Sequence, residues 1–209
     1  WKVHKFGGSS VADAACMERV AQIIEGDPTP RKAVVLSACR GVTDALLMLV
    51  ALAEQQDPSI DDRIRELRDR HVGVARELLA GPLLDEFVAE LDGDCRDVAG
   101  IVQTVRLVRA ASTTMRDLIA GYGELWSTRI FERALRSRGR TSGHVLWLDA
   151  RRVLLVEWGP LGPGVRWDQS RANLEQALPA DFVGTVVVTG FIATDTQGLQ
   201  TTLGRNGSD

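Results

Sequence analysis

Runs of β-branched residues alternate along the chain with stretches in which apolar residues recur every three or four positions. A first strand is predicted at Lys2–Phe6 and a helix at Ala12–Gly26. The continuous apolar run Lys32–Ala38 is typical of a central parallel strand with both faces covered, and Gly41–Glu54 follows it as a helix with an apolar face. Strands separated by helices predict a mostly parallel sheet packed between helices.

The middle of the chain, residues 60–139, has helical spacing almost throughout. The dipeptides Gly81-Pro82 and Asp92-Gly93 are expected to divide it into separate helices, of which the last covers Ala111–Arg138. The sequence Gly121-Tyr122-Gly123 lies inside this last helix, where each glycine costs about 1 kcal/mol relative to alanine. These glycines therefore predict a close neighbour that leaves no room for side chains.

Strand character returns in the last third of the chain. We expect a strand within residues 141–150, a turn-rich loop at 159–164 and a short helix at Trp167–Leu178. The segment FVGTVVVTGFIA, residues 182–193, predicts another core strand with its turn, and residues 194–209 predict a hairpin that leads into a second Gly/Ser loop.

The composition is that of a globular domain, because 44% of the 209 residues are apolar and 25% are charged. A net charge of −3 gives no basic surface of the kind that nucleic-acid-binding proteins use. The longest apolar run, Ala45–Ala53, is far shorter than the roughly 20 residues of a membrane span. The sequence predicts one α/β domain that binds neither nucleic acid nor a membrane.

Cysteine and histidine positions give no metal or nucleophile signature. Cys16, Cys39 and Cys95 are widely spaced, without a CxxC pair or a nearby histidine set. An odd number of cysteines without metal-ligand spacing indicates free thiols and a cytoplasmic location. The three histidines are equally scattered, so the sequence predicts neither a Ser-His-Asp triad nor a zinc site.

Three loops that each follow a predicted strand carry the candidate chemistry: Lys5–Ser10, Ser37–Asp44 and Leu203–Asp209. In an open parallel sheet, ligands bind at the carboxyl ends of strands, so these loops are expected to converge. Glycines in the first loop would let main-chain N–H groups approach phosphate oxygens, and its lysine would add a positive charge. Neither the P-loop nor the dinucleotide-binding pattern is present. Taken alone, the first loop is more simply a tight turn, and only the three loops together favour an anion site.

Six short motifs follow one another between Lys5 and Asp209: KFGGSSV, VVLSACRGVTD, GYGELWS, LDAR, VVVTGFIA and TTLGRNGSD. In this order they resemble the successive signatures of the aspartokinases, and most closely the kinase part of the bifunctional aspartokinase/homoserine dehydrogenases. The resemblance implies the amino-acid kinase fold, an α/β three-layer αβα sandwich with a mostly parallel central sheet that is incomplete at the C-terminus.

The resemblance also implies a domain organisation. Residues 1–209 would form the N-terminal, aspartate-binding part of the kinase domain, and the nucleotide-binding remainder, the regulatory ACT domains and a homoserine dehydrogenase segment would lie outside this chain. The fragment is expected to be inactive or nearly so. The full-length enzyme is expected to be a homo-oligomer.

The activity implied by the resemblance is phosphorylation of the β-carboxylate of L-aspartate by ATP and Mg²⁺, giving 4-phospho-L-aspartate, the first step toward lysine, methionine and threonine. The residues implied to hold the ATP phosphates are Lys5, Gly7, Gly8 and Ser9. The residues implied to bind aspartate are Ser37, Thr43, Glu124, Arg205, Asn206, Gly207 and Ser208. The residues implied to act in catalysis are Lys5 and Asp209.

The chemistry of phosphoryl transfer agrees with these roles. A side-chain carboxylate titrates near pH 4 and is ionised at neutral pH, so this nucleophile needs no general base. The transfer needs in-line positioning and neutralisation of charge, which Lys5 can supply together with magnesium. Arg205 can hold a carboxylate through two parallel hydrogen bonds. Glu124 is a natural partner for the substrate's ammonium group.

The same residues also have structural interpretations. Arg205 could be a surface arginine of a hairpin, and Glu124 could be one more solvated charge on a helix. Ser9, Thr43 and Asp209 could cap helices.

Asp149 and Arg151 of the LDAR motif are interpreted as structural.

Alternatives remain for the whole protein as well. The chain could belong to another kinase of the same fold, acting on acetylglutamate, glutamate or a nucleotide. It could also be a non-catalytic module for assembly or regulation.

Overall fold

A parallel sheet forms the centre of the protein. The structure is a computed structural model that describes residues 1–160 and 162–204. Sheet A has four parallel strands in the order β1 (Lys2–Phe6), β2 (Arg31–Leu36), β6 (Gly184–Thr189) and β3 (His144–Leu148). The predicted parallel sheet is confirmed, and the long apolar runs supply its two inner strands.

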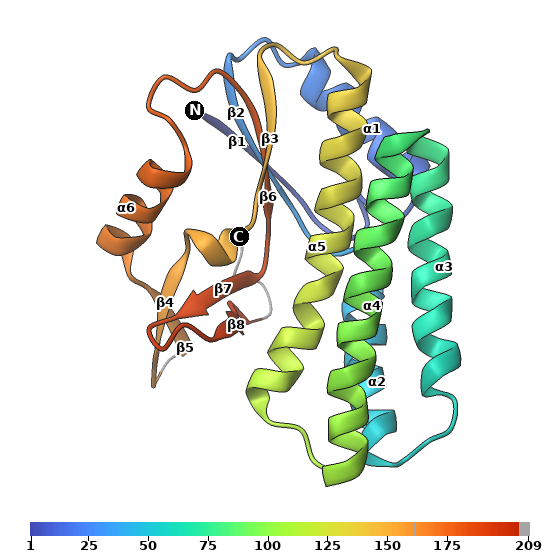
Figure 1. Ribbon diagram of the computed structural model, residues 1–209. Coiled ribbons are helices and arrows are strands. Elements are labelled where there is room, and N and C mark those ends of the chain that lie inside the picture. Colours follow the sequence, from blue (N-terminus) through green and yellow to red (C-terminus); the bar gives the residue numbers. More distant parts are fainter. Residues whose placement is uncertain (161, 205–209) are drawn as a thin grey trace.

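Helices cover both sides of sheet A, but unequally. Figure 1 shows α1 to α5 on one side of the sheet and α6 on the other. Their bounds are α1 (Ala14–Gly26), α2 (Val42–Glu54), α3 (Ile60–Leu78), α4 (Pro82–Val108), α5 (Thr113–Arg138) and α6 (Trp167–Ala177). The layers confirm the expected α/β sandwich. No helix in the described part of the chain is long and apolar enough to cross a membrane.

The predicted break at Asp92-Gly93 is wrong, because α4 runs through these residues without interruption. Buried apolar residues continue on one face of α4 on both sides of the glycine, from Phe87 to Val105. The Asp92 carboxylate also accepts a hydrogen bond of 2.6 Å from Arg68 Nε of α3. Packing of this face therefore outweighs the low helix propensity of a single glycine.

A second four-stranded sheet, sheet B, lies beyond the end of sheet A. Its order is β5 (Gly162–Val165), β4 (Leu155–Gly159), β7 (Ile192–Asp195) and β8 (Gln200–Thr202). The predicted loop at 159–164 is wrong, because β4 and β5 pair there as antiparallel strands. Pro163 fits because β5 is an edge strand, where a missing N–H donor is tolerated. The predicted hairpin is confirmed as β7–β8.

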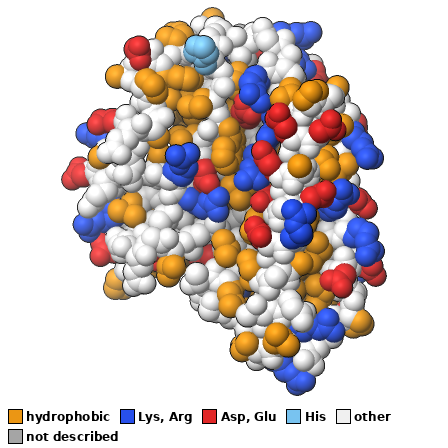
Figure 2. Space-filling model, in the orientation of Figure 1, with side chains coloured by type: hydrophobic (Ala, Val, Ile, Leu, Met, Phe, Trp, Pro, Cys, Tyr) orange, Lys and Arg blue, Asp and Glu red, His pale blue; other side chains and the backbone are white. Residues whose placement is uncertain are grey.

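The hydrophobic core lies between sheet A and the five-helix layer. Helix α5 runs through it and is buried on nearly all sides from Ile119 to Leu135. The other face of sheet A is apolar and more open, and hydrophobic side chains appear at the surface between α6 and the long helices (Figure 2). Helix α5 thus provides a fixed support for the loops at the carboxyl ends of the strands.

Candidate functional site

A cleft of about 540 Å³ opens where the carboxyl ends of β1 and β2 face the N-terminal half of α5. The loops after these strands line it, together with one face of α5 and the end of the β7–β8 hairpin. Its lining includes residues singled out from the sequence: Lys5, Gly7, Gly8, Ser37, Thr43 and Glu124. The structure brings these six residues together around one space.

The loop after β1 turns sharply against the loop after β2. The carbonyl oxygen of Gly7 accepts a hydrogen bond of 2.9 Å from Ser10 N. A Cβ on Gly8 would lie 2.8 Å from the carbonyl oxygen of Ala38, so this close approach requires glycine. Open space surrounds the Cβ position of Gly7, which leaves the main chain accessible to a bound group. Ser9 is exposed beside it.

The capping interpretation of Ser9 and Thr43 is wrong. Asp13 caps α1, where its carboxylate accepts a hydrogen bond of 2.7 Å from the amide of Cys16. Gly41 occupies the cap position of α2 with a φ of 76°, in the left-handed region that favours glycine. The Thr43 side chain lies in the first turn of α2 and lines the cleft.

Charges of both signs surround the cleft. Lys5 pairs in register with Val35 of β2, and its exposed side chain reaches the cleft at the end of β1. Arg40 adds a second cation, and Asp44 and Asp117 supply carboxylates on the α2 and α5 sides. A zwitterionic ligand would meet partners of both signs here.

Glu124 is the most unusual residue of the cleft, because it is an acidic residue that is only 2% exposed. One carboxyl oxygen, Oε1, accepts a hydrogen bond of 3.2 Å from Ala38 N, and the other, Oε2, is buried without a partner among the described residues. Burial raises the pKa of Glu124 to about 8, and the Ala38 amide only partly offsets this. The interpretation of Glu124 as a solvated helix charge is therefore wrong.

The two glycines on either side of Tyr122 explain how α5 comes so close to the loop after β2 and to the β7–β8 hairpin. A Cβ on Gly123 would lie 2.6 Å from Cβ of Ala38 and 3.1 Å from Cγ1 of Val42. A Cβ on Gly121 would lie 2.4 Å from Nε2 of Gln200. The prediction of close neighbours at both glycines is confirmed, and this contact places Glu124 against the loop after β2.

Five of the residues implied to act at the site lie outside the described residues: Arg205, Asn206, Gly207, Ser208 and Asp209. The last described residue, Gly204, lines the cleft and has a φ of 75°. Leu203 N donates a hydrogen bond of 2.8 Å to the carbonyl oxygen of Phe191, which fixes the direction of the chain as it leaves β8. That Lys5 and Arg205 share one cleft stays a prediction.

Sequence reasoning missed several residues of the cleft lining, among them Asp117, Phe191 and Thr202. Asp117 precedes Glu124 by seven residues, so helical spacing alone places both on one face of α5. Phe191 has a φ of 63°, a conformation that is uncommon for a residue with a side chain. No local sequence pattern predicts this conformation. Thr202 is the last residue of β8, and the β7–β8 hairpin places it at the cleft.

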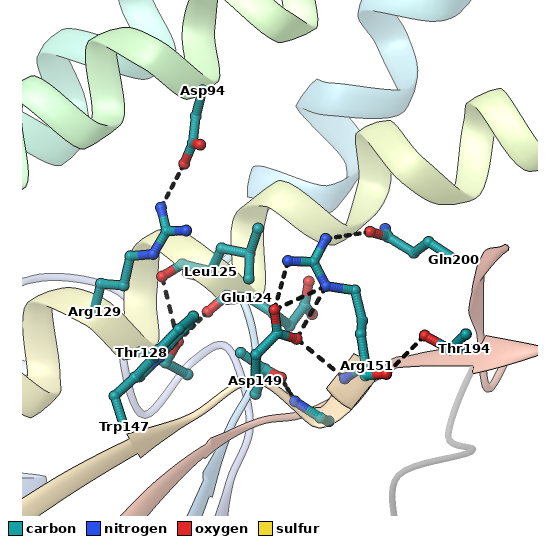
Figure 3. A network of polar contacts seen from close by, with 12 residues as sticks. Asp94, Glu124, Leu125, Thr128, Arg129, Trp147, Asp149, Arg151, Thr194 and Gln200 are labelled. Carbon is teal, nitrogen blue, oxygen red and sulfur yellow. Dashed lines mark hydrogen bonds and ion pairs between the residues drawn. The ribbon is translucent and has the colours of Figure 1, made fainter. Parts of the chain in front are cut away.

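The LDAR residues lie next to the cleft rather than in its lining. Asp149 and Arg151 bind each other, and Arg151 also binds Gln200 of β8 (Figure 3). Their structural interpretation agrees with these contacts. Among the described residues, no cluster of His, Cys, Asp or Glu could hold a metal ion.

Comparison with known proteins gives a consistent set of relatives. The chain is 34% identical over 212 residues to bifunctional aspartokinase/homoserine dehydrogenase 1 of Zea mays, which covers 100% of this chain and 22% of that protein. It is 34% identical over 210 residues to lysine-sensitive aspartokinase 3 of Escherichia coli strain K12, covering 99% of this chain and 44% of that protein. The chain therefore spans less than half the length of these relatives.

Solved structures agree with the sequence relatives. The structure of E. coli aspartokinase III in complex with aspartate and ADP superposes with a TM-score of 0.80 at 30% identity, over 99% of this chain and 44% of that one. The complex of the same enzyme with lysine and aspartate gives a TM-score of 0.81 at 30% identity, with the same coverage. The sequence pattern of the amino acid kinase family matches residues 1–209. The chain belongs to the amino acid kinase family.

Proposed function

We propose that the protein containing this chain transfers the γ-phosphoryl group of ATP to the side-chain carboxylate of L-aspartate, giving 4-phospho-L-aspartate and ADP. The observation that carries this proposal is the buried, half-satisfied carboxyl group of Glu124 in a cleft that also contains Lys5. An E. coli structural relative has been solved in complex with aspartate and ADP, which supports the same substrates.

Each charged group of aspartate would have a partner among the residues proposed for the site. Glu124 would accept hydrogen bonds from the α-ammonium group, which would satisfy its unpartnered oxygen. Ser37 and Thr43 would donate hydroxyl hydrogen bonds to carboxylate oxygens. We assign one of the two carboxylates of aspartate to Arg205, because a guanidinium group can bind a carboxylate through two parallel hydrogen bonds. Asn206, Gly207 and Ser208 would assist through their main chain.

The first loop suits the phosphates of ATP. Open space at the Cβ position of Gly7 leaves room for a phosphate oxygen near main-chain N–H groups, and Gly8 closes the loop onto Ala38. Lys5 would neutralise charge on the transferring oxygens, Ser9 would offer a hydroxyl group, and Mg²⁺ would arrive with the nucleotide. Asp209 would position Lys5.

The proposed reaction needs no general base. An ionised carboxylate oxygen of aspartate attacks the γ-phosphorus, and the bond from that phosphorus to the β–γ bridging oxygen breaks, so the electron pair leaves on ADP. Both charges that develop lie on oxygen atoms that cations can neutralise. We place this reaction at the start of lysine, methionine and threonine synthesis, in a homo-oligomeric enzyme of the cytoplasm.

Glu124 also discriminates between substrates of kinases with this fold. N-acetylglutamate has a neutral amide N–H in place of the ammonium group, so it would offer the buried carboxyl group one uncharged donor instead of a cation, and hydrogen bonds to charged groups are the stronger ones. Glutamate has the ammonium group but is one methylene longer than aspartate. Glu124 would therefore select for a free amino group, and the choice between aspartate and glutamate is left to the acceptor assay.

The test is ADP release by the full-length protein with aspartate, glutamate, N-acetylglutamate or a nucleoside monophosphate as acceptor, with the acyl phosphate trapped by hydroxylamine. We expect turnover and aspartyl hydroxamate with aspartate. Turnover with another acceptor only would replace the proposed substrate. Absence of turnover with all acceptors would support a non-catalytic module.

A further inference from the structure

We propose that Arg151 and Gln200 are positioning residues that hold one wall of the cleft against α5. This wall, the hairpin wall, consists of Phe191, Thr202 and Gly204. The proposal rests on the proposed function and adds to it two residues that do not line the cleft. Their role would be to set the distance between the hairpin wall and Glu124.

The first step is a fixed guanidinium group. Asp149 is buried and begins the short 3-10 helix η1 (Ala150–Arg152), where its carboxylate accepts a hydrogen bond of 3.0 Å from Arg151 N. The same carboxylate binds Arg151 Nε at 2.9 Å and Nη2 at 2.6 Å. A two-point contact of this kind fixes the plane of the guanidinium group as well as its position.

The second step joins this guanidinium group to α5 through Gln200. The amide oxygen of Gln200 accepts a hydrogen bond of 2.5 Å from Arg151 Nη1 (Figure 3). Its amide nitrogen donates to the carbonyl oxygens of Asp117 at 3.0 Å and Leu118 at 3.2 Å. Both ends of the amide group are therefore used, and a cationic donor on one side and two carbonyl acceptors on the other determine its orientation.

The third step is the space that α5 leaves for Gln200. A Cβ on Gly121 would lie 2.4 Å from Nε2 of Gln200 and 2.9 Å from Cγ2 of Ile192. A helical Cβ points toward the N-terminus of its helix, so a side chain at position 121 would cover the carbonyl groups one turn earlier. The glycine thus opens the helix surface to the glutamine.

The hairpin is attached to the same turn of α5 a second time. The Asp117 carboxylate accepts hydrogen bonds from Thr201 Oγ1 at 3.1 Å and from Thr202 N at 3.3 Å. Thr194 of β7, the register partner of Gln200, donates a hydrogen bond of 2.7 Å to the carbonyl oxygen of Arg151. The hairpin wall is therefore held against α5 by the Gln200 amide and the Asp117 carboxylate together, and Arg151 orients the first of these two contacts.

The experiment compares Gln200→Leu, Arg151→Met and the double variant in the full-length protein. Each single variant should raise the KM for aspartate on the order of tenfold, with kcat and the KM for ATP nearly unchanged. The double variant should be no worse than the poorer single variant, because both residues serve one contact. A merely structural role would lower the melting temperature and leave the KM for aspartate as it is.

Two further variants sharpen the result. Gln200→Glu keeps a partner for Arg151 but turns an acceptor toward the two α5 carbonyl groups, so it should behave like Gln200→Leu. Arg166→Met removes an exposed ion pair between the cap residue of α6 and Glu157 of β4, and it should leave all kinetic constants unchanged. A wild-type KM for aspartate in Gln200→Leu or Gln200→Glu would overturn the proposal.

A second readout separates this inference from the proposed function. Amide hydrogen exchange at Thr202, whose N–H binds Asp117, should be faster in Gln200→Leu and Arg151→Met than in the wild-type protein and in Arg166→Met. If the wild-type protein does not phosphorylate aspartate, the proposed function fails, but faster exchange at Thr202 in the two variants still supports the role of Arg151 and Gln200. Unchanged exchange at Thr202 would contradict that role, whatever the substrate.

Discussion

At the scale of single residues, the site depends on one carboxyl group that is buried without its full set of partners. Glu124 has one weak hydrogen bond from Ala38 N and an oxygen with no partner in the described part of the chain. Burial raises its pKa to about 8, so the group is mostly protonated at neutral pH before a ligand binds. An ammonium group would favour its ionised form.

The affinity for aspartate should therefore increase with pH. Binding to an ionised Glu124 from a protonated state releases one proton, so below pH 8 the affinity should increase by up to about tenfold per pH unit and level off above it. Isothermal titration between pH 6 and pH 8.5, in buffers of different ionisation enthalpy, measures both effects. Glu124→Gln should bind weakly and lose the pH dependence. An equally steep dependence in Glu124→Gln would show that another group titrates.

His71 of α3 should make the fold sensitive to acid. The residue is 1% exposed, its ring packs edge-on against Trp126, and its Nε2 has no partner among the described residues. Burial lowers its pKa to about 4, so the unfolded state binds more protons between pH 6.5 and pH 4, and stability falls as the pH falls through this window. The loss is on the order of 3 kcal/mol.

Denaturant unfolding at pH 7 and pH 4.5 checks this dependence. His71→Leu keeps an apolar side chain against Trp126, and we expect its stability to fall less between the two pH values than that of the wild-type protein. Equal losses in both proteins would mean that His71 does not carry the effect.

At the scale of elements, α5 determines the geometry of the cleft. Its two glycines let the loop after β2 and the β7–β8 hairpin approach its backbone, and Glu124 lies directly after the second of them. The helix is buried on nearly all sides, so it cannot shift without disturbing the core.

Gly123→Ala should weaken aspartate binding although it improves helix propensity. The new Cβ would lie 2.6 Å from Cβ of Ala38, and overpacking of this kind costs about 1–3 kcal/mol, against about 1 kcal/mol gained in propensity. Thermal unfolding and aspartate titration measure both consequences. Gly100→Ala in α4 is the matched control, because its Cβ meets nothing within 4 Å and should stabilise the protein. Stabilisation by Gly123→Ala with unchanged binding would contradict the packing argument.

The sequence predicted those parts of the fold that are encoded locally. The apolar runs predicted the inner strands of sheet A, and the glycines at positions 121 and 123 predicted a close contact without naming the partner. Packing on neighbouring elements decided the rest. Helix α4 continues through Gly93 because its buried face continues, and β5 forms because β4 lies beside it. The burial of Glu124 could not be predicted, because it depends on a loop far away in the sequence.

At the scale of the whole molecule, long-range ion pairs join the first helix to the last long one. The Arg138 guanidinium group at the end of α5 binds the carboxylates of Glu25 at 2.5 Å and Glu18 at 2.5 Å, both in α1. Fourteen residues separate Arg138 from Glu124, which is about 21 Å along a helix. Stability and the site can therefore be perturbed separately.

Arg138→Met should lower the free energy of unfolding by about 2–4 kcal/mol, because it leaves two carboxylates, one of them largely buried, without their cation. The KM for aspartate should not change. Denaturant unfolding and steady-state kinetics measure the two quantities. The control is Arg63→Met, which removes an exposed pair with Glu66 and should change stability by less than about 0.5 kcal/mol. A raised KM in Arg138→Met would show that the two ends of α5 are coupled.

A crystal structure of the full-length protein with L-aspartate and a non-hydrolysable ATP analogue tests the proposed role of Glu124 most directly. We expect aspartate in the cleft, with its ammonium group within hydrogen-bond distance of Glu124 and its side-chain carboxylate on the Lys5 side, facing the terminal phosphate. Aspartate bound elsewhere, or bound here with Glu124 still unpartnered, would show that Glu124 does not hold the ammonium group of the substrate.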